Sequence, residues 1–307
     1  MNYILITAAR NEQAFIARTL ESVTTQTRPP VRWVIVDDGS TDQTAAIVAG
    51  YAQKFPWIQL IQNPRREGRN FAAKANAVNG AFAACQPLEF EVVGNLDADT
   101  SFAPGYMEFL LNKFEADRRL GCAGTPFTQD GGYDSTRDSY EGENYVAGPI
   151  QLFRRDCFRA IGGYIANPAG GVDWIAVMTA RLKGWTVRSY DDLRYHHHRS
   201  MGTAERNEVV ALFTYGEKDY YLGNSPVWEL FRVAYRLLKK PYVAGGMALF
   251  LGYFWAMLRR VKRPISNELM RYHRADQMKK LKAILRSALR LKKEDSFRTG
   301  SGPAKPN

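Results

Sequence analysis

The amino-acid sequence predicts an α/β protein with a Rossmann-like, mostly parallel sheet that is covered by helices on both faces. Short apolar runs typical of buried strands alternate with longer helical patterns through the first half of the chain, and each run ends at polar turn residues. The expected strands are Tyr3–Thr7, Trp33–Val36, Ile58–Ile61, Glu91–Asn95 and Gly121–Thr125, and the expected helices are Glu12–Gln26, Thr41–Lys54, Phe71–Ala84 and Tyr106–Arg119.

The stretch after the second expected strand carries the most information about function. The apolar run Val34–Val36 is followed by two adjacent acids, Asp37 and Asp38, and then by Gly39, which suits a turn with positive φ. Ser40–Asp42 offers N-cap residues for the next helix. Ligands of doubly wound sheets lie at such carboxyl ends of strands. Two acids there suit ribose hydroxyls and base N–H groups better than phosphate, so the loop predicts a nucleoside site.

Four segments resemble family 2 glycosyltransferases. Residues 31–44, VRWVIVDDGSTDQT, resemble the DDGSTD loop of that family, and residues 4–12 resemble its opening strand. Residues 68–76 look like its Gly-to-Asn helix start, and residues 92–99 form a strand ending in a D-x-D motif. The resemblance covers roughly residues 1–215. It implies a GT-A fold and an enzyme of the bacterial polysaccharide-biosynthesis type.

The D-x-D motif predicts a metal site. Asp97 and Asp99 alternate at a strand end, so both carboxylates can reach one ligand, and a divalent ion would neutralise a departing diphosphate. The resemblance implies that Asp99 binds Mg²⁺ or Mn²⁺ directly and that Asp97 contacts the donor ribose or the metal. The alternative is a polar turn that caps the helix after Pro104.

The run His196–Arg199 is ambiguous. On an extended strand the outer two histidines face one way and the middle one the other. Either one of them completes the metal shell, with His198 as the candidate, or the cluster packs at a strand end without a ligand. Arg199 is a candidate partner of the diphosphate.

The resemblance also implies a set of donor contacts. Asp38 is expected to meet the base, and the turn after the first strand the nucleoside. The chain has Ala8, Ala9 and Arg10 where many relatives have a proline and a tyrosine, so the resemblance does not imply an aromatic stack on the base. The complete set of candidate donor-binding residues is Ala8, Arg10, Glu12, Asp38, Arg69, Lys74 and Asp97.

Asp173 is the candidate general base. A carboxylate within hydrogen-bond reach of an acceptor hydroxyl can take its proton during transfer. Many family members have Glu-Asp at this place, whereas this chain has Val172 and Asp173. The alternative is that Asp173 only caps the helix that follows.

Charge is unevenly placed along the chain. The whole chain carries a formal charge of +11, yet residues 228–293 contain seventeen Lys and Arg against three acids, so the first two thirds are close to neutral. Within this basic region, Tyr242–Leu258 is an uncharged run of seventeen residues, at the lower limit for a membrane span. Basic residues flank both ends, which favours a re-entrant or in-plane helix. The interleaved apolar residues argue for an anionic membrane surface and against nucleic acid.

Composition adds the cellular setting. Cys85, Cys122 and Cys157 show no C-x-x-C spacing and are expected to be buried thiols in a reducing compartment. The N-terminal residues have no basic region typical of a secretory signal. We therefore expect a peripheral or monotopic protein at the cytoplasmic face of the inner (plasma) membrane. The expected organisation is a catalytic domain over residues 1–223, a basic amphipathic helical region over 224–295 that associates with the membrane, and a disordered tail over 296–307.

Together these features predict metal-dependent, inverting transfer of a sugar from a nucleotide-diphospho-sugar to a polyprenyl-diphosphate-linked saccharide. Such a reaction belongs to surface or exopolysaccharide assembly. Two alternatives fit the same motifs: a polyprenyl-phosphate glycosyltransferase, and a non-catalytic nucleotide-binding membrane adaptor.

Overall fold

The computed structural model describes residues 1–65, 71–136, 142–167, 170–199 and 208–289. The described chain divides into two compact units. The first contains residues 1–167 and 172–199, and the second contains residues 170–171 and 208–289.

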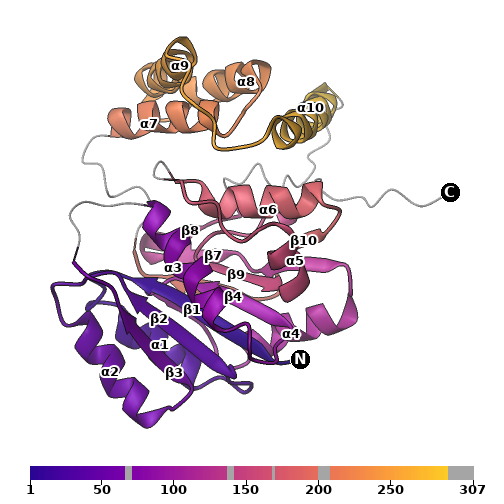
Figure 1. Ribbon diagram of the computed structural model, residues 1–307. Helices are drawn as coiled ribbons and strands as arrows, with labels where there is room; N and C mark the ends of the chain where they lie inside the picture. The colour runs from indigo at the N-terminus through magenta and orange to yellow at the C-terminus, as the bar shows by residue number, and fades with distance from the viewer. Residues whose placement is uncertain (66–70, 137–141, 168–169, 200–207, 290–307) are drawn as a thin grey trace. The chain divides into compact units, whose positions relative to one another are not determined.

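The first unit is built on a seven-stranded sheet with the order β10-β6-β9-β4-β1-β2-β3 (Figure 1). All neighbours pair in parallel except β9, which runs antiparallel to both β4 and β6. This confirms the predicted mostly parallel sheet. The strands are β1 (Tyr3–Ala9), β2 (Arg32–Asp37), β3 (Ile58–Gln62), β4 (Val92–Leu96), β6 (Leu120–Gly124), β9 (Ile150–Arg154) and β10 (Thr186–Ser189).

Side chains alternate between two apolar cores, one on each face of this sheet. In β1, Tyr3 and Leu5 lie in one core, whereas Ile4 and Ile6 lie in the other. Both cores are covered by helices, which is why the strands are apolar at consecutive positions. The helices of this unit are α1 (Ile16–Thr24), α2 (Thr44–Lys54), α3 (Phe71–Ala84), α4 (Tyr106–Ala116), α5 (Arg155–Ala160) and α6 (Val172–Leu182).

A smaller four-stranded sheet has the order β5-β11-β7-β8. Its strand β11 pairs antiparallel with β5, which places His197 opposite Thr100 and His196 opposite Ser101. The small sheet therefore brings the histidine run beside the acids that follow β4. Its strands are β5 (Thr100–Ser101), β7 (Phe127–Gln129), β8 (Tyr133–Asp134) and β11 (Tyr195–His197), and short 3₁₀ turns cover Asp130–Gly132 and Gly142–Asn144.

The first helix begins later than its sequence pattern predicts. We expected it from Glu12, but α1 begins at Ile16. The amides of Phe15 and Ile16 both donate to the carbonyl of Glu12, at 2.9 and 2.8 Å, and so close a turn ahead of the helix. Asn11, directly before this turn, has a φ of +54°. Glu12 therefore lies in this turn and not on the surface of α1.

The second unit contains four helices in its described residues. Helices α7 and α9 approach closely: a Cβ added to Gly216 would lie 2.2 Å from the carbonyl oxygen of Leu249, and one added to Gly252 would lie 2.0 Å from that of Phe213. Only glycine permits this contact. Helix α7 thus belongs to this unit, although it lies ahead of the predicted boundary after residue 223. The helices are α7 (Glu208–Tyr221), α8 (Pro226–Leu237), α9 (Tyr242–Leu258) and α10 (Asn267–Leu289).

Helix α9 is the uncharged run predicted from the sequence. It has seventeen residues. Among the helices of the described ranges, none combines the length and the apolar character needed to cross a membrane.

A buried acid lies between the helices of the second unit. The side chain of Glu229 is fully buried, and its Oε2 accepts a hydrogen bond from Asn224 Nδ2 at 3.4 Å. The nearest cation, Arg232, contacts Asp219 and lies 3.8 Å from Glu229. Burial, reinforced by the charge of Asp219, raises the pKa of Glu229 to about 8, and Arg232 only partly opposes this. The folded unit therefore holds this carboxyl in its neutral form at neutral pH.

This raised pKa predicts a stability that falls with pH. Between the ordinary pKa of a glutamate and about 8, the unfolded chain has lost the proton that folded Glu229 keeps, so rising pH favours unfolding. The free energy of unfolding should fall by more than about 1 kcal/mol between pH 5 and pH 8. Glu229→Gln should reduce this fall, as measured by urea unfolding followed by circular dichroism. A variant with the slope of the parent protein would contradict the assignment.

Candidate active site

The carboxyl ends of three neighbouring parallel strands gather the predicted site residues at one edge of the large sheet (Figure 1). Ala8 and Arg10 lie at the end of β1, Asp38 directly after β2, and Asp97 and Asp99 after β4. The amide of Asp38 donates to the carbonyl of Ala9 at 2.8 Å, which joins the first two strand ends.

The two acids after β2 have different surroundings. Asp37 is buried, and its carboxylate accepts hydrogen bonds from the amide of Ser40, at 3.2 Å, and from the Ser40 hydroxyl. Gly39 has a φ of +72°, and a Cβ there would lie 2.7 Å from the Cα of Arg65. Asp37 therefore shapes the loop, whereas Asp38 is only partly buried.

The turn after β1 is fixed to the same loop by reciprocal hydrogen bonds. The amide of Asn11 donates to Ser40 Oγ at 2.9 Å, and the amide of Thr41 donates to Asn11 Oδ1 at 2.8 Å. The amide of Glu12 donates to Thr44 Oγ1 at 2.8 Å. These contacts set the direction from which the Glu12 side chain enters the site.

Asp99 is buried and lies between two basic groups. Its Oδ1 is 3.4 Å from His197 Nε2, and its Oδ2 is 3.3 Å from Arg199 Nε. Arg199 reaches further, with Nη2 2.6 Å from Glu12 Oε2. Burial alone would raise the pKa of Asp99, but the hydrogen bond from His197 and the charge of Arg199 outweigh it, so the pKa is lowered. Asp99 is therefore ionised in the folded protein.

Asp97 is paired with Lys74 from the first turn of α3. Burial raises the pKa of Asp97, and the charge of Asp99 adds to this, while Lys74 opposes both. Burial lowers the pKa of Lys74, but the nearby carboxylates, Asp97 first, raise it overall. The positive charge of Lys74 therefore acts on both Asp97 and Asp99.

Glu12 completes this group of acids. Burial raises the pKa of Glu12 to about 7, Arg199 opposes the rise, and the charges of Asp99 and Asp97 add to it. The Glu12 carboxyl therefore titrates near neutral pH. Such tuning by burial and neighbouring charge is frequent at functional sites.

The side chain of the middle histidine, His197, contacts the carboxylate of Asp99, whereas His198, the candidate metal ligand, donates its backbone amide to the Asp99 carbonyl at 2.8 Å. Gln129 Nε2 donates to His197 Nδ1 at 2.8 Å and to the Arg199 carbonyl at 2.8 Å, so His197 carries its proton on Nε2, toward Asp99. The His198 ring instead stacks on Phe15 at 5.9 Å. Its nitrogens contact Ser101 Oγ at 2.9 Å and Arg18 Nη1 at 3.2 Å.

Asp173 lies in the first turn of α6 and is partly buried. Its Oδ2 accepts a hydrogen bond from the Tyr145 hydroxyl at 3.2 Å. A Cβ added to Gly148 would lie 2.6 Å from the same oxygen, so the chain passes this carboxylate closely. The charge of Asp173 helps to raise the pKa of Lys74, as do the charges of Asp97 and Asp99, so all three acids act on the same lysine. Sequence reasoning missed Tyr145, Gly148 and Gln129, because no local pattern marks these contacts.

The remaining predicted donor residue, Arg69, lies outside the described residues. Within the described ranges there is no group of three or more His, Cys, Asp or Glu side chains that could hold a metal ion. Magnesium is commonly bound through one or two carboxylates, with substrate phosphates and water supplying the other positions. The neighbouring carboxylates of Asp97 and Asp99 fit an ion of that kind better than a closed protein cage.

The order of the large sheet, with acids at the carboxyl ends of β2 and β4, is the arrangement expected of a GT-A fold. Residues 4–166, more than half of the chain, match the family described as "Glycosyl transferase family 2". The chain belongs to this family of glycosyltransferases, as the sequence motifs predicted.

Similar proteins include two bacterial synthases. Chondroitin synthase of Escherichia coli is 30% identical over 117 residues, which cover 38% of this chain and 16% of that protein. Beta-monoglucosyldiacylglycerol synthase of Synechocystis is 27% identical over 180 residues, which cover 52% of this chain and 36% of that protein. The chain thus spans less than two fifths of the length of either relative.

A solved structure shares the fold. The mannosyltransferase PcManGT from Pyrobaculum calidifontis, in complex with GDP-Man and Mn²⁺, has a TM-score of 0.55 and 19% identity. The match covers 97% of this chain and 82% of that one. The predicted GT-A fold is thereby confirmed.

The contacts of His197 predict its tautomer. Because the Gln129 amide nitrogen faces Nδ1, the ring proton should lie on Nε2, which donates to Asp99. Nitrogen-15 NMR of histidine-labelled protein should show a protonated Nε2 and an unprotonated Nδ1, and Gln129→Leu should remove this preference. A proton on Nδ1 would mean that the Gln129 amide oxygen faces the ring, and it would leave Nε2 able to bind a metal.

Proposed function

We propose that the chain transfers a sugar from a nucleotide-diphospho-sugar to an acceptor hydroxyl in a metal-dependent, inverting reaction. The observation that carries this is the placement of Asp97 and Asp99 at the carboxyl end of β4, where Arg199 joins Asp99 to Glu12 in the turn after β1. The structural neighbour from Pyrobaculum, which holds GDP-Man and Mn²⁺, supports the proposed donor and ion.

The donor would lie across the strand ends. Asp38 would bind the base or ribose, and the turn of Ala8, Arg10 and Glu12 would line the nucleoside. Lys74 would supply positive charge for the diphosphate, and we propose the same role for Arg69. Asp97 and Asp99 would hold Mg²⁺ or Mn²⁺, which when bound neutralises the charge that develops on the departing diphosphate.

Asp173 would serve as the base. Its carboxylate takes the proton of the acceptor hydroxyl while that oxygen forms a bond to the anomeric carbon. The bond from this carbon to the diphosphate oxygen breaks on the opposite side, and the diphosphate leaves with the electron pair. One such displacement inverts the configuration of the sugar. The Tyr145 hydroxyl, which donates to Asp173 Oδ2, would hold the carboxylate toward the acceptor.

The acceptor would be a saccharide linked to a phosphate-bearing lipid at the cytoplasmic face of the membrane. Fifteen of the nineteen large apolar side chains that are exposed in the described chain lie between Val209 and Val261. The excess positive charge lies in the overlapping residues 228–293, which contain seventeen Lys and Arg against three acids. Apolar surface with flanking cations suits an anionic bilayer. The Synechocystis relative is named as a synthase of a glucosyl-diacylglycerol, which supports a lipid-linked acceptor.

Loss of Asp99 tests the metal and the activity together. Purified protein should release the sugar from at least one of the UDP-, GDP- and dTDP-sugars when Mn²⁺ is added, and Asp99→Asn should lower this rate about a hundredfold or more. Asp130→Asn, which changes an exposed acid in the 3₁₀ turn after β7, is the control and should change little. Thermal unfolding checks that both variants fold. Absence of metal-dependent turnover with every donor would favour the non-catalytic adaptor.

Loss of Asp173 tests the base. Asp173→Asn keeps the size of the side chain but cannot take a proton, so kcat should fall about 10²–10⁴-fold with donor affinity unchanged. Gly148→Ala should share the defect, because its Cβ would displace Asp173 Oδ2. Gly80→Ala, where a Cβ meets open space, is the matched control. Collapse of donor binding in Asp173→Asn would instead make Asp173 a donor-side residue.

A further inference from the structure

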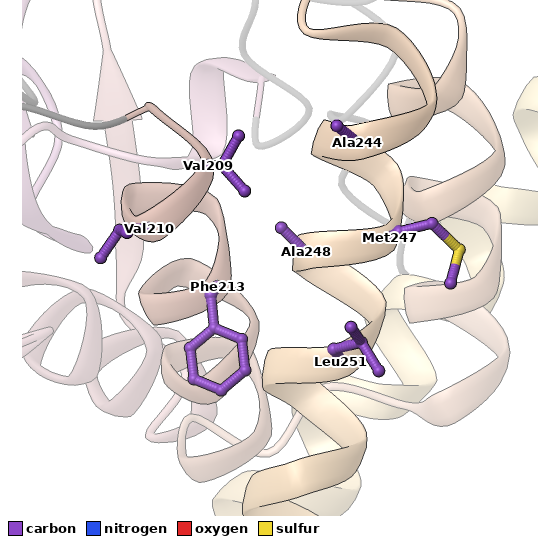
Figure 2. A pocket seen from close by; sticks show the side chains of 7 residues that line it. All are labelled: Val209, Val210, Phe213, Ala244, Met247, Ala248 and Leu251. Atoms are coloured by element: carbon purple, nitrogen blue, oxygen red, sulfur yellow. The ribbon is translucent and has the colours of Figure 1, made fainter.

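The second unit contains an apolar groove between α7 and α9 with a volume of about 370 Å³. Figure 2 shows Val209 and Ala244 at one end of it and Phe213 and Leu251 toward the other. The groove lies beside the contact between Gly216 and Gly252, where the backbones of the two helices meet. Its lining consists only of apolar side chains: Val209, Val210, Phe213, Ala244, Met247, Ala248 and Leu251.

This lining selects the chemistry of an occupant. A peptide or sugar in the groove would lose hydrogen bonds to water without gaining partners, and each such group costs free energy. A hydrocarbon chain has no polar atoms to satisfy and gains from leaving water. The volume is near the lower end of the range for ligand pockets, which suits a segment of one chain.

The groove opens onto an exposed apolar stripe of α9. Met247 and Leu251, which are 45% and 52% exposed, line the groove and also belong to this stripe. The stripe repeats every three or four residues, so it forms one face of the helix. Exposed apolar surface of this extent usually has a partner. Its members are Val243, Met247, Leu251, Trp255 and Leu258.

A cation lies at one end of the groove. Arg236 Nη2 is 2.8 Å from Oε1 of Glu208, the first residue of α7, and Arg236 Nε lies 3.4 Å from the position of a Cβ on Gly245. Gly245 directly follows the groove residue Ala244. Within the described chain, Arg236 Nε is buried and has no hydrogen-bond partner. Lys239 and Lys240 follow in sequence, so the three cations outnumber Glu208 and the net positive charge favours an anionic group.

We propose that the groove binds the hydrocarbon tail of the phosphate-bearing lipid acceptor, with the phosphate toward Arg236. This rests on the proposed function for the identity of the acceptor. The charge at one end and the apolar walls at the other match the two parts of such a lipid. The groove therefore contributes to acceptor affinity, whereas the stripe on α9 contacts the bilayer.

The test uses the full chain with dodecyl phosphate below its critical micelle concentration, measured by isothermal titration calorimetry. The protein should bind this probe, and inorganic phosphate should bind at least about tenfold more weakly. Ala244→Phe should weaken probe binding about tenfold or more, the loss expected when a ring displaces two or more methylene groups. Val243→Phe adds the same ring one residue away, outside the groove lining, and should change affinity less than about twofold.

A second pair guards against a misfolded variant. Leu251→Lys places a charge in the groove, whereas Leu258→Lys places it on the same stripe outside the groove. Only the first should abolish probe binding, and thermal unfolding should be alike for the two. Arg236→Gln should reduce the affinity for dodecyl phosphate to that for dodecyl maltoside, which has the same tail and a neutral head.

Three results would overturn the proposal. Unchanged probe binding in Ala244→Phe and Leu251→Lys would remove the groove as the site. Binding to anionic vesicles without binding to the monomeric probe would assign the whole face to the bilayer. A concentration-dependent dimer that Leu251→Lys dissociates would assign it to a second copy of the chain. Release of sugar from the donor with Mn²⁺ is measured separately, so failure of the proposed function and failure of the groove give different results.

Discussion

The burial of one carboxylate, Asp99, organises the first unit. A buried charge is costly unless it is paired, and here the compensating groups come from segments far apart in the sequence. His197 is the last residue of β11 in the small sheet, Arg199 follows that strand, and Arg199 in turn contacts Glu12 from the turn after β1. The ion pairs thus connect the end of β4, the small sheet and the first strand. The site therefore exists only when both sheets are assembled.

The charge balance of this cluster explains its proposed affinity for a cation. Glu12, Asp97 and Asp99 contribute three carboxyls, whereas Lys74 and Arg199 are the permanent cations in contact with them. Burial is the main cause of the raised pKa values of Glu12 and Asp97, and the charge of Asp99 adds to both. A divalent ion would relieve this excess of acid and at the same time accept phosphate oxygens. The electrostatics of the ligand-free chain therefore support a metal shared with the donor.

The sequence predicted the features that depend on local patterns. Consecutive apolar positions in β1 and β2 indicated a sheet covered on both faces, and the position of the D-x-D motif followed from the end of β4. The alternation of the histidine run was also correct, but choosing among its members needed the pairing of β11 with β5, which is set by contacts almost a hundred residues apart. The same holds for Tyr145 beside Asp173. The sequence also did not show that α7 belongs to the second unit, because that depends on the packing of Gly216 against α9.

Helix α9 shows how one composition serves two purposes. Its uncharged sequence resembles a short membrane segment, yet Gly245, Gly246 and Gly252 are buried, and the last of these lies against the backbone of α7. Packing therefore uses the glycine face, and the larger side chains, such as Met247 and Trp255, remain on the exposed side. A helix held in this way is apolar all round but presents only one face outward. The proposed attachment along a membrane plane depends on this one-sided surface, which has cations at both ends.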